Sequence, residues 1–166
     1  MKKIVSLFLT LIFVGFSLSS YSQTAQQTLS YLQTYYTTIR TTFGKIEMDY
    51  SGLYISEGIV KGSFLVISCE RMENGTCVKY GNTEIKCETI TGISLYFQPY
   101  ILHYDNGESK TETDESWRLE IHYFDGQTEL LQLPPNDKNY AVRLKNAIIK
   151  LAKYSGAKIT DENLFN

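Results

Sequence analysis

The stretch SCERMENGTCVKYGNTEIKCE, residues Ser68–Glu88, contains all three cysteines of the chain and two hairpin signals. Asn74-Gly75 and Gly81-Asn82 are dipeptides typical of two-residue turns between antiparallel strands. They predict three short strands, in which Cys69 lies opposite Tyr80. The same register decides which residues of this stretch face the core and what the cysteines do.

The register divides the predicted strands into an apolar face and a charged face. Glu70, Lys79 and Glu84 lie side by side on the charged face, and opposite charges on neighbouring strands stabilise a sheet by up to about 1 kcal/mol per pair. Lys79 is expected opposite Glu84. The apolar face is expected to contain Ile67, Cys69, Val78, Tyr80, Ile85 and Cys87.

In this register no two cysteines come within about 7 Å between Cα atoms, the distance that a disulfide requires. We therefore expect Cys69 and Cys87 to be small core residues and Cys77 to lie on the wetter face. A three-residue turn at Gly81–Thr83 is the alternative, because it places Cys77 opposite Cys87 and permits a disulfide between them. An odd number of cysteines in an exported chain keeps this pairing open. The spacing lacks the short pairs of a structural zinc site, so no metal is expected.

The first 22 residues have the three-part pattern of a secretory signal peptide. Lys2 and Lys3 precede an apolar run from Ile4 to about Leu18, and small residues at 20 and 22 fit a cleavage site. The run is shorter than the roughly 20 apolar residues of a comfortable membrane span, although an uncleaved anchor is the alternative. We expect the mature chain to begin near Gln23, to lack a stable span, and to reside in the periplasm or outside the cell.

The composition of residues 23–166 predicts a single α+β domain with a substantial core. The chain has 43% apolar residues and 13 tyrosines. Without residues 1–22 it has 14 basic and 18 acidic residues, a net charge of −4. A mildly acidic domain is a poor nucleic-acid binder, because that affinity comes mainly from cations on phosphates. No nucleic-acid partner is therefore expected.

Two amphipathic helices are predicted to flank a run of antiparallel strands. Apolar residues at spacings of three and four predict a helix over residues 24–43, and a second over 138–155 after a cap at Asn136 or Asp137. Leu144, Ile148 and Leu151 should cover the apolar face of a strongly bent sheet or open barrel of six to eight strands, with the first helix outside or at an edge. The expected strands are Lys45–Tyr50, Leu53–Val60, Ser63–Arg71, Thr76–Tyr80, Thr83–Thr91, Ser94–Tyr104, Trp117–Phe124 and Thr128–Leu133.

Two histidines supply the candidate polar site. Alternation along Trp117–Phe124 places Glu120 and His122 on a wet face, and a hairpin closing near Tyr104 and Trp117 would bring His103 and Asp105 to it. Such a patch is expected to be a solvated sheet face; a general acid–base pair or a weak metal site is the alternative. Residues 105–116 are expected to form a solvated loop. No catalytic or cofactor motif is found, so neither catalytic residues nor a cofactor are expected.

The second helix has a strongly basic composition, with five cations and no acid between residues 138 and 154. This pattern predicts a basic solvent face; contact with an acidic partner or a membrane surface is the alternative. The cations are Lys138, Arg143, Lys145, Lys150 and Lys153.

The order helix, antiparallel strands, amphipathic helix resembles small exported bacterial proteins of unknown function. TLSYLQTYY (28–36) and RLKNAIIKLAKYSGAK (143–158) are the segments most similar to them. From Lys45 onward the order is also similar to a pleckstrin-homology-like (PH-like) domain, which implies a curved sheet closed by one helix and no catalytic residue. We expect a non-enzymatic exported module that binds a protein or a small apolar ligand. The alternatives are an envelope protein that oligomerises and a hydrolase-like enzyme using the His103/His122 face.

Overall fold

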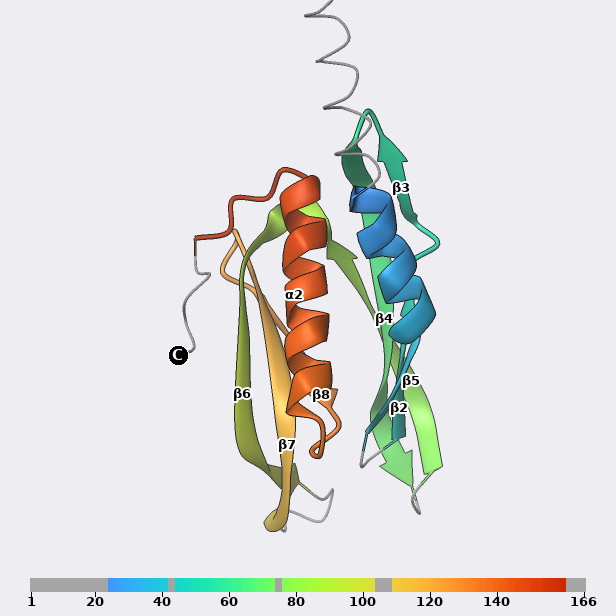
Figure 1. The fold of residues 1–166 in the computed structure, drawn as a ribbon. Coiled ribbons are helices and arrows are strands. Elements are labelled where there is room, and N and C mark those ends of the chain that lie inside the picture. The colour runs from blue at the N-terminus through green and yellow to red at the C-terminus, as the bar shows by residue number, and fades with distance from the viewer. Residues whose placement is uncertain (1–23, 42–43, 74–75, 104–108, 161–166) are drawn as a thin grey trace, which may run out of the picture.

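The computed structural model describes residues 24–41, 44–73, 76–103 and 109–160 (Figure 1). These residues form an α+β fold with a helix at each end of the chain order and antiparallel strands between them. Residues 24–35 are the N-terminal helix, and α2 is Lys138–Tyr154. The strands are β1 Thr38–Thr41, β2 Gly44–Asp49, β3 Leu53–Ser56, β4 Ile59–Glu73, β5 Thr76–Lys86, β6 Ile90–His103, β7 Ser109–Tyr123 and β8 Thr128–Leu133, with the short 3-10 helix η1 Cys87–Thr89 before β6.

The strands form two antiparallel sheets rather than one bent sheet. In the first, β1 pairs with β2, and β4 pairs with β2, β3 and β5; in the second the order is β6-β7-β8. The sheets approach each other at Thr83 of β5 and Glu129 of β8, where burial raises the pKa of the Glu129 carboxyl and the threonine side chain offsets part of that rise. The prediction of an α+β chain with antiparallel strands is confirmed, and the sheets do not close into a barrel.

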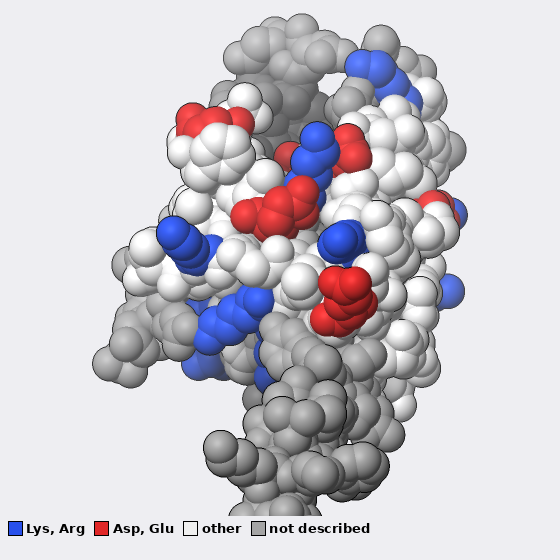
Figure 2. All heavy atoms as spheres, turned by 90° about the horizontal axis from the view of Figure 1, so that it is seen from above, with Lys and Arg blue, Asp and Glu red and all other residues white. Residues whose placement is uncertain are grey.

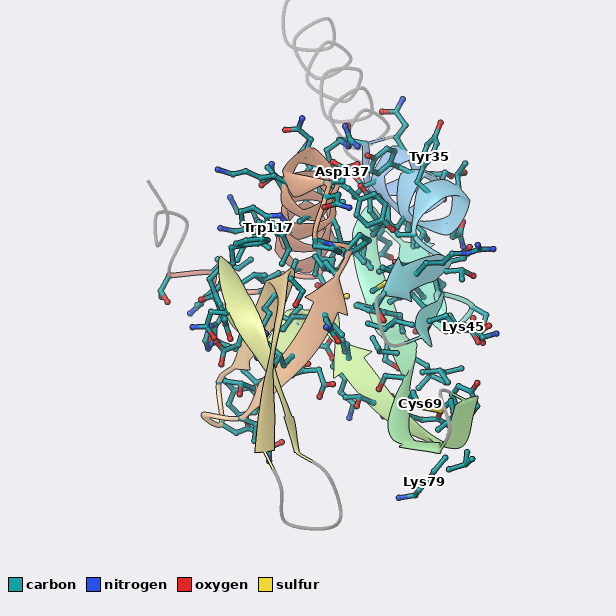
Figure 3. The ribbon with its side chains drawn as sticks, turned by 90° about the horizontal axis from the view of Figure 1, so that it is seen from below. Tyr35, Lys45, Cys69, Lys79, Trp117 and Asp137 are labelled. Atoms are coloured by element: carbon teal, nitrogen blue, oxygen red, sulfur yellow. A yellow bond between two sulfur atoms is a disulfide. The ribbon has the colours of Figure 1, made fainter. Side chains whose placement is uncertain are left out.

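The two helices lie on one side of the strands and together cover the core (Figures 1 and 3). α2 buries Leu144, Ile148 and Leu151 completely, as predicted. The N-terminal helix buries Ala25 and Leu32 completely as well. The first helix was expected on the outside of the sheet or against an edge, and its apolar stripe belongs to the same buried core as that of α2.

The N-terminal helix ends earlier than predicted. The sequence pattern favoured a helix over 24–43, but residues 38–41 form β1. Ile39 is buried and lies opposite Ile46 of β2. The threonines around Ile39 are β-branched, which lowers helix propensity and favours a pleated strand. The spacing of the apolar residues was compatible with both structures, and pairing with β2 decides between them.

α2 has the ends that its sequence predicts. The side chain of Asp137 accepts a hydrogen bond from the backbone N–H of Tyr140 at 2.7 Å, which satisfies one donor of the first turn. Gly156 follows the helix with a φ of +87°, a conformation that glycine adopts without strain.

The cations of α2 do not all face solvent. The prediction of a basic solvent face is wrong at Lys145, which is only 9% exposed.

The β4–β5 hairpin is longer than the sequence predicted. Cys69 lies opposite Tyr80, as expected, but β5 continues through Gly81-Asn82 and ends with Lys86 opposite Ser63. The predicted turn at Gly81-Asn82 and the pairing of Lys79 with Glu84 are wrong. β4 has 15 residues, long enough to pair with all of β5, and a turn at Gly81 would forfeit these backbone hydrogen bonds.

The longer hairpin also changes which side chains reach the core. Lys79 lies opposite Arg71, and Glu84 lies opposite Leu65, so the expected charge ladder does not form. Ile85 is buried as predicted, whereas Val78 and Tyr80 are half-exposed instead of buried.

Cys69 and Cys77 form a disulfide with their Cα atoms 5.8 Å apart. Both the core position predicted for Cys69 and the alternative Cys77–Cys87 bond are therefore wrong. The register shifts between Cys69 and Arg71 and between Arg71 and Met72, and these irregularities disturb the alternation of faces on which the prediction depended. Cys87 is a free, fully buried thiol, as predicted.

The β6–β7 hairpin extends through much of the segment that was predicted to be a loop. β7 begins at Ser109 rather than at Trp117, and His103 lies opposite Ser109 at the far end of β6. The acidic composition of residues 105–116 suggested solvation. Strand pairing with β6 satisfies the backbone without requiring apolar side chains at that end.

Candidate functional site: the groove between the N-terminal helix and α2

A groove of about 290 Å³ separates the N-terminal helix from α2. This volume is near the lower end for small-molecule sites and suits one or two side-chain-sized groups. No acidic residue is among those that line it. The lining residues are Thr24, Gln27, Thr28 and Tyr31 of the N-terminal helix and Arg143, Asn146, Ala147 and Lys150 of α2.

The wall formed by α2 carries the positive charge of the groove. Arg143, Asn146, Ala147 and Lys150 recur at helical spacings and therefore lie along one stripe of α2. Seen from above, Lys and Arg atoms form a group at the lower left and also lie beside Asp and Glu atoms at the centre and on the right (Figure 2). The groove thus lies on the basic helix of a chain whose net charge is negative.

Tyr36 holds the two helical segments together beside the groove. Its ring is fully buried and packs on Tyr140 of α2 with 4.7 Å between ring centroids. Its hydroxyl donates to the backbone oxygen of Tyr140 at 3.3 Å and lies 3.4 Å from the hydroxyl of Tyr31. The backbone oxygen of Tyr36 accepts a hydrogen bond from the Tyr50 hydroxyl at 3.3 Å. These contacts fix the position of the groove relative to the core.

The same tyrosine orients Arg143. Burial raises the pKa of Tyr36, and a hydrogen bond from the Arg143 guanidinium offsets part of that rise. The hydrogen bond to Tyr36 raises the pKa of Arg143 in turn, so the guanidinium remains charged. A guanidinium has five donors in a planar fork, so one contact to a phenol leaves donors for a ligand.

A second hollow lies on the outer side of the N-terminal helix and shares Gln27 and Tyr31 with the groove. Tyr35 lines it, is 62% exposed and packs on Tyr31 with 5.0 Å between ring centroids. Residues 24–35 include no charged side chain. Charge-poor surfaces with exposed tyrosine are typical of the central part of protein interfaces.

The polar patch predicted on the second sheet forms only in part. Nε2 of His122 lies 2.8 Å from Oγ of Ser94, and Glu120 lies directly opposite Ser94 on the neighbouring strand. His103 is opposite Ser109, whereas His122 is opposite Gly92, so about 11 residues of strand separate the two histidines, roughly 36 Å. The structure does not bring His103 to this patch, and Asp105 lies outside the described residues.

The pair of Ser94 and His122 has the distance of a nucleophile and its base, but its surroundings favour a structural role. Ser94 is only 6% exposed. The two residues lie on β6 and β7, which pair with each other along this stretch. No group of three potential metal ligands occurs among the described residues.

The residues of the groove were only partly predictable. The sequence indicates the basic face of α2 and offers contact with an acidic partner as one interpretation, but it does not indicate the second wall from the N-terminal helix. Tyr36 and Tyr140 are 104 residues apart in sequence, and no local pattern indicates their contact.

No protein-family model, curated protein or solved structure matches the chain. In the part of the chain that the structure describes, no helix has the length and apolar character needed to cross a membrane. The function is therefore inferred from the chemistry of this chain's own surface.

Proposed function

We propose that the chain is an exported, non-enzymatic module that binds a partner protein through the surface formed by the N-terminal helix and α2. Export rests on the signal-peptide pattern of residues 1–22 and places the module in the periplasm or outside the cell. We also propose that the chain is related to PH-like exported proteins. The observation that carries the proposal is the groove with the adjoining hollow, because together they combine two cations with the exposed ring of Tyr35.

The groove favours a protein over a small apolar ligand. Hydroxyl, amide and cationic groups share its walls with apolar surface, and a mixed lining of this kind suits a peptide, which has both a polar backbone and side chains. The apolar sides of the sheets meet α2, and Leu144, Ile148 and Leu151 fill that space. A hydrolase-like function has weaker support, because Ser94 is buried in a paired strand.

An envelope protein that oligomerises is the second candidate. Among the described strands, β5 pairs only with β4, and its half-exposed Val78 and Tyr80 lie near the free edge. Pairing between the β5 edges of two copies is disfavoured by the charges of Lys79 and Lys86 and by the register shift after Cys77. Light scattering on the purified mature chain separates the candidates, since the binding module should be a monomer.

Photo-crosslinking in the native host tests the proposed surface. A benzophenone amino acid replaces Gln27 on the groove wall, or Asn82 on the exposed strand β5 as the matched control. The proposal predicts one discrete crosslinked protein from position 27 and none of that mass from position 82. Equal adducts from both positions, or adducts only from position 82, would show that the helical surface is not the contact surface.

A further inference from the structure

We propose that the groove between the N-terminal helix and α2 binds an acidic segment of the partner, with one carboxylate on Arg143 and a second on Lys150. This inference rests on the proposed function and adds the chemistry of the ligand. It assigns a separate role to each wall: α2 neutralises the carboxylates, and the N-terminal helix contacts the peptide between them.

The spacing of the two cations sets the spacing of the two acids. Arg143 and Lys150 are seven residues apart on one helix, which corresponds to about 10.5 Å along its axis. Three residues of an extended or polyproline-type chain span about 9–10 Å. In a polyproline-type chain, which has three residues per turn, acidic residues at positions i and i+3 lie on the same side and therefore match both cations at once, whereas in a β-strand they would point to opposite faces.

The groups between the cations suit a peptide backbone. Asn146 lies between Arg143 and Lys150 along α2, and Gln27 lines the facing wall. A side-chain amide has both a donor and an acceptor, so it can pair with the N–H and C=O of a peptide. Ala147 leaves room on the α2 wall.

Arg143 offers the stronger carboxylate contact of the two cations, because its charge is spread over a rigid planar group with five donors, whereas Lys150 has a single flexible ammonium. A planar guanidinium also accepts a carboxylate with two parallel hydrogen bonds. We therefore expect Arg143 to contribute more than Lys150.

A free phosphate or a lipid surface fits this site less well. One phosphate is too small to reach two cations about 10 Å apart along a helix. A membrane surface would attract every exposed cation of α2 to a similar degree and would not require the amide of Gln27 in the facing wall. The paired amides and cations of the groove favour a peptide.

Fluorescence anisotropy with the mature chain from Gln23 tests this inference. The probe is a rhodamine-labelled peptide with four repeats of Glu-Ala-Ala, and the control probe has four repeats of Gln-Ala-Ala. Arg143→Gln and Lys150→Gln remove the two groove cations, and Lys86→Gln removes an exposed cation of β5 as the matched control. Circular dichroism confirms that each variant folds.

The inference predicts binding of the glutamate probe, at least a tenfold loss with Arg143→Gln, a smaller loss with Lys150→Gln, and less than a twofold change with Lys86→Gln. Equal losses in all three variants would indicate only non-specific charge attraction and would overturn it. Equal binding of the glutamine probe would do the same. So would full competition by 1 mM inorganic phosphate, or binding to phosphatidylglycerol vesicles without affinity for the peptide. If the peptide test fails but crosslinking at position 27 is retained, the acidic-peptide inference is overturned and the proposed protein-binding surface still stands.

Discussion

Reduction of the Cys69–Cys77 disulfide should weaken the fold by a measurable and calculable amount. The two residues are eight apart in sequence. Loss of the crosslink restores loop entropy to the unfolded chain, and a loop of this size corresponds to about 2.5 kcal/mol. Measured values often fall below this model, so we expect a decrease of about 1.5–2.5 kcal/mol in the free energy of unfolding.

Urea unfolding of the mature chain with and without dithiothreitol measures this difference without changing the sequence. With a typical urea dependence of about 2 kcal/mol/M, the midpoint should fall by about 1 M on reduction. The Cys87→Ala variant is the control. Cys87 is not part of the disulfide, so the urea midpoints of the oxidised and reduced forms of this variant should differ by the same 1 M.

Thiol labelling supplies an independent check of the pairing. Denatured, unreduced protein should react with one equivalent of maleimide, at Cys87, and denatured reduced protein with three. Three reactive thiols before reduction, or identical urea midpoints in both redox states, would refute the assignment and with it the irregular register of the β4–β5 hairpin.

Three further predictions concern the core, the backbone and pH. Phe64→Ala should cost about 3–5 kcal/mol in urea unfolding because its ring is fully buried, whereas Leu65→Ala, on the outer face and 37% exposed, should cost less than about 1.5 kcal/mol; similar costs would contradict the assigned faces. Gly62→Ala should destabilise far more than Gly126→Ala, although both have positive φ, because a Cβ at position 62 would clash with the Gly52 carbonyl oxygen and one at 126 would meet open space; an equal shift in melting temperature would contradict the close packing of Gly62 on Gly52. Burial raises the pKa of the Cys87 thiol to about 12, so the folded state keeps a proton that the unfolded chain loses above about pH 9, and stability should fall between pH 9 and 12. Urea midpoints across this range should fall less steeply in Cys87→Ala, and identical slopes would contradict the burial of the thiol.

The sequence was sufficient where local chemistry and the final fold agree. The cap at Asp137, the buried stripe of Leu144, Ile148 and Leu151, and the end of α2 near Gly156 all follow from residues close together in the chain. These features depend on helix periodicity and capping, which need no information about distant strands.

The sequence was insufficient where a local signal competes with long-range pairing. Gly81-Asn82 has turn chemistry, but pairing of β5 with the long strand β4 keeps it extended. The register shifts between Cys69 and Met72 have no local signal in the sequence, and they concealed the Cys69–Cys77 disulfide. Thr38–Thr41 could continue a helix or form a strand, and the contact with β2 selects the strand.

The candidate site shows the same limit. The cations of α2 are visible in the sequence, and contact with an acidic partner was one interpretation of them. The groove itself exists because Tyr36 packs on Tyr140 and places the N-terminal helix beside α2. A contact between residues so far apart in sequence has no local pattern, so Gln27 could not be assigned to the site from the sequence.

The most direct test of the central claim is a nitrogen-15 NMR titration of the mature chain with the glutamate peptide. The account predicts that amide shifts concentrate at Gln27, Tyr31, Asn146 and Lys150, while amides of the second sheet near Ser94 and His122 stay within error. Shifts that concentrate around Ser94 and His122, or a spectrum unchanged by the peptide, would contradict the assignment of the groove as the binding site for an acidic segment.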